Sequence, residues 1–192
     1  MKKKYFAILF TALVFTGCSS KSNFYQLHTN DHVSGNRADR IKQNVIGIAE
    51  VEVAGYLDQP QIVNRLNEGR VNVHEEERWA GSFPKNIQTV LTQNLSKLLP
   101  SYTLLASPWE EPVSDRYRIY VSIDRFDGDQ NGTVVLDGRW SLVDKEENRM
   151  ITGEKIRYID RGGITLDDMV ATQSRLLDRL SRSIAKKVRS RL

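Results

Sequence analysis

The chain has 192 residues, with 28 Lys and Arg against 24 Asp and Glu, and a formal net charge of +4. Three of the basic residues belong to an N-terminal segment, and without residues 1–17 the remaining 175 residues carry +1. The C-terminal segment Arg175–Leu192 alone carries +6, so residues 18–174 carry −5. This balance argues against a nucleic-acid-binding protein built on a basic domain.

The first eighteen residues have the order of a secretory signal. The cationic start Lys2–Lys4 is followed by an apolar run from Phe6 to Phe15, and a small residue, Gly17, precedes Cys18. At about ten residues the apolar run is too short for a transmembrane helix, which needs roughly 20. We therefore expect residues 1–17 to be a signal peptide that is removed from the mature protein.

Cys18 is the one cysteine of the chain, and the order Val14-Phe15-Thr16-Gly17-Cys18 resembles a bacterial lipobox. Such a cysteine carries a diacylglyceryl thioether and an acylated N-terminus, with chains such as palmitate, whereas a free thiol would be reactive in an oxidising compartment. We expect lipidation of Cys18, a short polar tether at residues 18–22, and no cofactor besides this covalent lipid. The alternative is an ordinary signal peptide that ends near a cysteine by chance.

Residues 23–192 are predicted to form a single domain, because a chain of this size buries most of its apolar surface in one core. In the first half, alternating apolar and polar residues predict four strands, and the polar stretch Thr29 to Asn44 is predicted to be a loop. Ser82 as N-cap and Pro84 in the first turn predict a helix that ends before Pro100. The predicted strands are Phe24–His28, Val45–Val53, Gln61–Leu66 and Arg70–His74.

The second half repeats this order. A long amphipathic helix is predicted from Leu166 to Leu192, with Asp167 and Asp168 in its first turn and basic residues near its end, as the helix dipole favours. The predicted strands are Tyr102–Leu105, Tyr117–Asp124, Val134–Leu142 and, near a sheet edge, Met150–Ile159. The order ββββα-ββββα indicates an α+β fold, with a mainly antiparallel sheet and two helices packed on one face.

The sequence has no pattern typical of an enzyme or a metal site. His28, His32 and His74 have no partner at the spacing of metal ligands. The stretch Asp127–Gly132 starts like a calcium loop, but the closing Glu is replaced by Gly138, so we interpret it as a β-turn. A phosphate-binding loop and a nucleophile elbow are also missing. We therefore expect no catalytic residue, no bound metal and no enzymatic activity.

Two stretches are candidates for protein contacts. Tyr56 and Leu57 lie in a turn flanked by Pro and Gly, and we expect both side chains to project from the rim of the sheet. Trp79 precedes the helix cap, where it either packs in the core against the helix start or serves as an aromatic anchor in an interface. Tyr56, Leu57 and Trp79 are thus the candidate residues for a partner or subunit interface.

Six segments in the same order resemble the PqiC family of ABC-type transport auxiliary lipoproteins. They cover nearly the whole chain after Cys18. At Gly81–Pro84 the chain departs from the family, which more often has an acidic or polar residue followed by Pro-Leu. The six segments are Phe24–Leu27, Tyr56–Arg65, Arg78–Ala80, Ile123–Gly128, Gly132–Trp140 and the helix from Leu166.

The resemblance implies a lipoprotein anchored in the outer membrane and facing the periplasm. Ser19, rather than Asp, after the lipidated cysteine resembles the lipoproteins that are exported to the outer membrane. The implied partners are outer-membrane lipid and an MCE-domain protein, similar to PqiB, that bridges the envelope and moves lipid between the membranes. The resemblance also implies a homo-oligomeric ring, to which the end of the bridging MCE-domain protein docks. The alternative is a structural or assembly lipoprotein, such as a pilotin or a peptidoglycan-synthase activator.

Overall fold

The computed structural model describes residues 21–29, 44–109 and 114–192. The predicted signal peptide, the lipidation site Cys18, tether residues 18–20 and His32 lie outside the described residues. The same holds for residues 30–43 of the predicted loop.

The larger of two sheets has the strand order β6-β2-β7-β8-β9, and β3 also pairs with β7. β7, β8 and β9 form long antiparallel ladders, and β9 lies at the edge, as predicted. The predicted single strand Val45–Val53 is divided into β2 and β3, which pair in parallel with successive parts of β7. The bounds are β2 Val45–Ile48, β3 Glu52–Val53, β6 Thr103–Ala106, β7 Tyr117–Gly128, β8 Thr133–Asp144 and β9 Arg149–Arg161.

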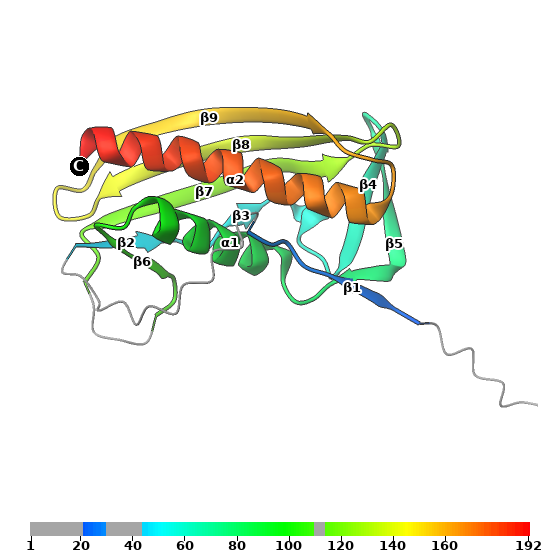
Figure 1. Ribbon diagram of the computed structural model, residues 1–192, viewed down its shortest axis with the longest axis horizontal. Helices are drawn as coiled ribbons and strands as arrows, with labels where there is room; N and C mark the ends of the chain where they lie inside the picture. The colour runs from blue at the N-terminus through cyan, green and yellow to red at the C-terminus, as the bar shows by residue number, and fades with distance from the viewer. Residues whose placement is uncertain (1–20, 30–43, 110–113) are drawn as a thin grey trace, which may run out of the picture.

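A separate three-stranded sheet has the order β1-β5-β4 and lies at the end of the molecule away from the C terminus (Figure 1). Its strands are β1 (Asn23–Tyr25), β4 (Gln61–Asn67) and β5 (Arg70–Trp79), and β5 continues five residues beyond the predicted end. Two sheets therefore replace the one that the sequence predicts. Each sheet contains both parallel and antiparallel pairs, because β1, β2, β3 and β6 all pair in parallel. The long ladders are the antiparallel ones.

Both predicted helices are confirmed, and both cover the same face of the large sheet (Figure 1). α1 (Phe83–Leu98) begins at the N-cap Ser82, whose hydroxyl accepts from the amide of Lys85, and has Pro84 in its first turn. α2 (Leu166–Arg191) begins with a capping box between Thr165 and Asp168. These local bonds satisfy amide donors that have no partner within a helix start.

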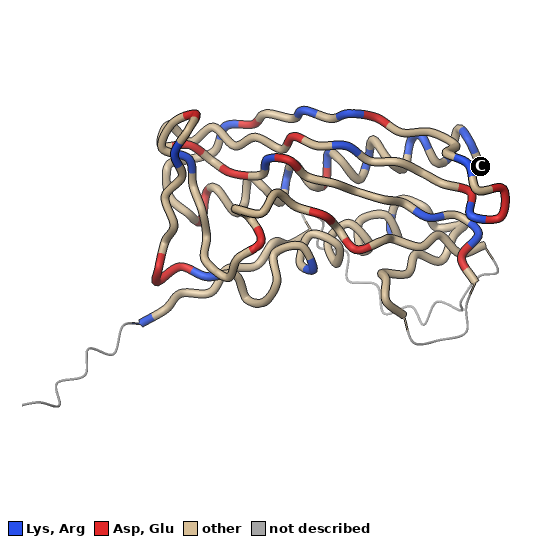
Figure 2. The backbone as a smooth tube through the Cα atoms, turned by 180° about the vertical axis from the view of Figure 1, so that it is seen from behind, with Lys and Arg blue, Asp and Glu red and all other residues tan. Residues whose placement is uncertain are grey.

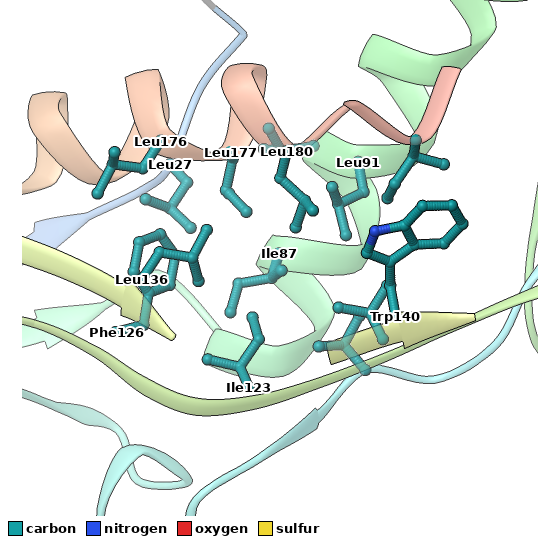
Figure 3. Packing of buried hydrophobic residues seen from close by; sticks show 14 of the residues in the cluster. Leu27, Ile87, Leu91, Ile123, Phe126, Leu136, Trp140, Leu176, Leu177 and Leu180 are labelled. Carbon is teal, nitrogen blue, oxygen red and sulfur yellow. The ribbon is translucent and has the colours of Figure 1, made fainter. Parts of the chain in front are cut away.

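The core fills the space between the two helices and the large sheet. Apolar side chains from α1 and α2 point toward those of β7 and β8, and Leu27, from the segment after β1, lies among them (Figure 3). Gln88, a buried residue of α1, donates to the carbonyl oxygens of Ile48, Ala49 and Ser107 at 3.1, 3.0 and 2.9 Å. This amide ties the helix to the end of β2 at a place where the strand stops pairing.

The opposite face of the large sheet has no described helix over it (Figure 2). Residues of both charge signs are distributed along its long strands (Figure 2), and the exposed Tyr120 and Met150 line one hollow together with charged residues of β8 and β9. The molecule therefore has one closed, helix-covered face and one open sheet face.

Candidate interaction surface

Segments far apart in the sequence meet at the end of the molecule where β1 leaves toward residue 18. We call this region the tether end; it consists of β1, the turn Gly55–Pro60, the last residues of β5 and the first turn of α1. The amide of Trp79 donates to the oxygen of Pro60, and the amide of Ala80 to the oxygen of Tyr25, both at 2.8 Å. Three of the family-like segments noted in the sequence are thus joined through the backbone.

Trp79 lies in the core of the tether end. Its side chain is only 5% exposed, and its ring stacks on Phe83 with the ring centroids 4.3 Å apart and an interplanar angle of 17°. Phe83 in turn contacts Phe126 of β7, with centroids 5.9 Å apart. Of the two sequence interpretations of Trp79, this geometry corresponds to packing against the helix start.

The expectation that Tyr56 and Leu57 project from the rim of the sheet is wrong. They belong to the short 3₁₀ turn η1 (Gly55–Leu57), which directs the side chain of Leu57 into the core, where it is 2% exposed. An apolar side chain in a short turn gains free energy by entering an adjacent core. The role of Tyr56, Leu57 and Trp79 in partner contact stays a prediction. Since Leu57 and Trp79 are buried, direct contact is open only to the exposed part of Tyr56.

The hydroxyl of Tyr56 binds a fully buried carboxylate, Asp127, at 2.6 Å. Asp127 is the penultimate residue of β7 rather than part of the turn predicted there. It also accepts from Arg65 of β4, at 3.2 Å from Nε and 2.9 Å from Nη2, and from Nε of Arg125 at 2.9 Å. One carboxylate therefore holds together the turn, the small sheet and the large sheet.

Burial raises the pKa of Tyr56 to about 12, and the hydrogen bond to Asp127 acts in the same direction. The phenol thus stays protonated and a donor throughout the physiological range. Asp127 has two guanidinium partners and this hydroxyl, which is the full satisfaction that a buried charge requires. The cluster is a structural joint, because every group in it is bound to another.

A groove of about 410 Å³ lies beside this joint at the surface of the tether end. Its floor includes the stacked rings of Trp79 and Phe83, and its rim includes Phe24, Pro60 and Arg78. Phe24 is 67% exposed although it belongs to a strand. Because Phe24 is directly paired with Arg78 in the β1–β5 register, an aromatic ring and a guanidinium lie next to each other on this rim.

A second hollow of about 400 Å³ lies on the open face of the large sheet. Tyr120 and Met150 provide its apolar lining, and residues of both charge signs surround them. Glu50 and Glu52 lie toward β3, opposite Arg139 and Lys155. This mixture of charges does not select one class of ligand.

The remaining buried carboxylates lie at the far end of the large sheet. Asp115 accepts from Arg118 at 2.7 and 2.9 Å and from Lys145 at 2.8 Å, and Asp144 accepts from Arg116 at 3.1 and 3.2 Å. Both are engaged in ion pairs, and Asp144 also accepts from the amides of Glu146 and Glu147 in the turn that follows β8. Within residues 21–29, 44–109 and 114–192, three or more His, Cys, Asp or Glu side chains nowhere gather as metal ligands would.

Neither α1 nor α2 has the length and hydropathy needed to cross a membrane, and no other described segment is helical over such a length. The candidate-site residues that the sequence analysis did not nominate are Phe24 and Arg78, which line the groove, and the Asp127 cluster. Phe24 and Arg78 each belong to a family-like segment of the sequence. Their proximity could not be predicted, because it depends on the pairing of strands whose partner residues are 54 positions apart. The sequence signal for Asp127 was an acidic side chain just beyond the alternating stretch Tyr117–Asp124, where β7 continues to Gly128.

A family model described as ABC-type transport auxiliary lipoprotein component matches residues 25–185. The chain is 27% identical over 146 residues to the intermembrane transport lipoprotein PqiC of Escherichia coli K12, a match that covers 74% of each chain. The Shigella flexneri protein of the same name matches to the same extent.

Two solved structures are similar over most of their length. An uncharacterized protein has a TM-score of 0.72 and 20% identity, over 88% of this chain and 99% of its own. Protein XCC0632 from Xanthomonas campestris has a TM-score of 0.65 and 16% identity, over 85% and 93%. At these identities the likeness shows a shared fold.

Proposed function

Because the chain belongs to the ABC-type transport auxiliary lipoprotein family, we propose that it is the outer-membrane lipoprotein subunit of an MCE-type intermembrane lipid transport system. The observation that carries the proposal is the match to an intermembrane transport lipoprotein over about three quarters of both chains. In this proposal the protein docks the end of a periplasm-spanning MCE-domain protein and works as a homo-oligomer.

The proposed role is docking rather than catalysis. The buried carboxylates Asp115, Asp127 and Asp144 are each held by at least one cationic side chain, so none is left to act as an acid or base on a substrate. The two larger hollows are open grooves on the surface. A binding function needs only such exposed surfaces, held in place by a rigid core.

The lipid anchor at Cys18 sets the orientation of the protein in this proposal. Asn23, the start of β1, lies five residue steps after Cys18. An extended chain spans at most about 3.5 Å per step, or about 18 Å in all. The tether end is therefore held close to the outer membrane, and the opposite end of the large sheet points into the periplasm. Of the three nominated residues, Tyr56 is the candidate for direct contact at the tether end, whereas Trp79 lines the groove there and Leu57 packs in the core.

The test is purification of the tagged full-length protein from its native envelope in mild detergent, followed by mass spectrometry of the proteins that come with it. We expect an MCE-domain protein to co-purify with the wild type. With Cys18→Ala, which cannot be acylated, we expect the protein to leave the outer-membrane fraction and the yield of the MCE-domain protein to fall. Recovery of a secretin or a peptidoglycan synthase instead would contradict the transport role.

A further inference from the structure

We propose that Phe24 and Arg78 form a membrane-contact patch that rests on the phosphate-bearing headgroups of the bilayer to which the protein is anchored. The inference rests on the proposed function, because it requires a lipid at Cys18. It adds to that function a second, non-covalent contact between this chain and lipid, and it assigns that contact to two residues of the tether end.

The first observation is the exposure of Phe24. At 67%, its phenyl ring is more exposed than any other aromatic side chain that the structure describes. Its backbone is held rigidly, because β1 pairs with β5 in register from Asn23 to Tyr25. A large apolar side chain on a fixed strand gains free energy when it leaves water, so this position indicates a surface that becomes covered.

The second observation is the charge beside the ring. Arg78 is the direct register partner of Phe24, and its Nε is 3.4 Å from the oxygen of Glu75. Among the described residues, neither Arg78 nor Lys21, which is exposed three residues before Phe24, forms an ion pair. Asp58 is the acidic residue that lines the groove at this rim. An aromatic ring with adjacent Lys and Arg is the combination found at headgroup level in membrane proteins.

The third observation is the length of chain before the patch. Six residues lead from Cys18 to Phe24, so a lipid on Cys18 keeps the ring within about 20 Å of the bilayer surface. The headgroup layer on each side of a bilayer is several ångströms deep, which brings the patch within reach of phosphates when the tether is partly folded. A guanidinium binds a phosphate through paired, charge-assisted N–H donors. An uncharged surface would not offer this interaction.

The matched control for this patch is Met150. It is 65% exposed, nearly the same as Phe24, and it also belongs to a strand. It lies at the start of β9, next to the β8–β9 turn, which is at the same end of the molecule as the C terminus and opposite β1 (Figure 1). The two residues therefore differ in their place relative to the tether but not in exposure or kind of element.

The experiment uses full-length acylated protein with Phe24→Cys or Met150→Cys, each labelled with an environment-sensitive fluorophore. The thioether at Cys18 leaves the introduced cysteine as the sole free thiol. The proteins are reconstituted into vesicles of phosphatidylethanolamine and phosphatidylglycerol, with and without phospholipid that carries a quencher near the headgroup. We expect quenching at position 24 to exceed that at position 150 by about threefold or more, and Arg78→Glu to reduce the difference.

Three results would overturn the patch. Acylated, vesicle-bound protein with equal quenching at positions 24 and 150 would refute it while leaving the proposed function intact. A fluorophore at position 24 that is shielded from water but not quenched by lipid would mean that a second copy or a protein partner covers the ring. Protein that carries no lipid on Cys18 and stays off the vesicles would refute both the patch and the anchor in the proposed function.

Discussion

At the scale of single residues, Asp127 is the most consequential side chain of the tether end. It is fully buried, and its partners Tyr56, Arg65 and Arg125 come from three different elements. Removing one partner of a buried ion pair leaves an uncompensated charge, which costs far more than loss of an exposed ion pair. The joint between the two sheets thus depends on one carboxylate.

We predict that Asp127→Asn lowers the free energy of unfolding by about 3 kcal/mol or more, because both guanidinium groups lose their counter-charge. Tyr56→Phe should cost about 1 to 2 kcal/mol, since Asp127 keeps both arginines and loses one hydroxyl donor. Urea unfolding followed by circular dichroism measures both values. Equal losses for the two variants would contradict the assignment of the joint to the ion pairs.

Stability in acid should depend on Asp115 and Asp144. Burial opposes ionisation of Asp115, but hydrogen bonds from Arg118 and Lys145 outweigh it, so its pKa lies below the ordinary value of 3.8. The pKa of Asp144 is lowered in the same way, against burial, by the amide of Glu147 and by Arg116. A carboxyl whose pKa is lower in the folded state stabilises the fold above its unfolded pKa, and that stabilisation is lost as pH falls through the folded pKa.

We therefore expect a nearly constant free energy of unfolding from pH 7 to about 5, and a decline that begins near the unfolded pKa of about 4. The variant Asp115→Asn should be less stable at neutral pH and should show a shallower decline in acid. Urea titrations at a series of pH values test this. An acid slope identical to that of the wild type would show that Asp115 does not carry the effect.

At the scale of elements, β7 leaves no room for a side chain on β8 at Gly138. The pairing of these strands shifts register between Ile123 and Arg125, next to the place where a Cβ on Gly138 would overlap the backbone oxygen of Ser122. The Cα of Ile123 would lie 3.0 Å away. Backbone atoms on a central strand cannot move aside as a side-chain end does, so glycine is required here.

Gly138→Ala should consequently destabilise the protein by about 2 kcal/mol or more, although alanine usually fits a strand better than glycine. Gly69→Ala serves as control, because a Cβ there meets no atom within 4 Å in the turn between β4 and β5. Thermal unfolding of the two variants separates a local clash from a general effect of replacing glycine. A loss no greater for Gly138→Ala than for Gly69→Ala would contradict the close approach.

The helices and the long strands could be predicted because their signals are local. Ser82 and the first-turn Asp168 mark helix starts, and the alternation along β7 is readable over eight residues. The division into two sheets was not predictable, because it depends on which distant strands pair. The inward direction of the Leu57 side chain was not predictable for the same reason, because it packs against residues that are distant in the sequence.

At the scale of the whole molecule, the two ends have different features. The tether end contains β1, the groove and the Asp127 joint, and the other end contains the C terminus and the β8–β9 turn (Figure 1). The family match covers residues 25–185 and so includes the Asp127 joint at one end and the β8–β9 turn at the other, and the sequence could point to this family through six ordered segments. The pairing of the exposed Phe24 with Arg78 could not be recognised before the strand register was known.

The most direct test of the central claim is mass spectrometry of the N-terminal peptide from protein isolated from separated outer and inner membranes. The account predicts a peptide that begins at Cys18, carries a diacylglyceryl thioether and an acylated amino group, and is found in the outer membrane. An unmodified Cys18, a retained segment 1–17, or acylated protein confined to the inner membrane would contradict it.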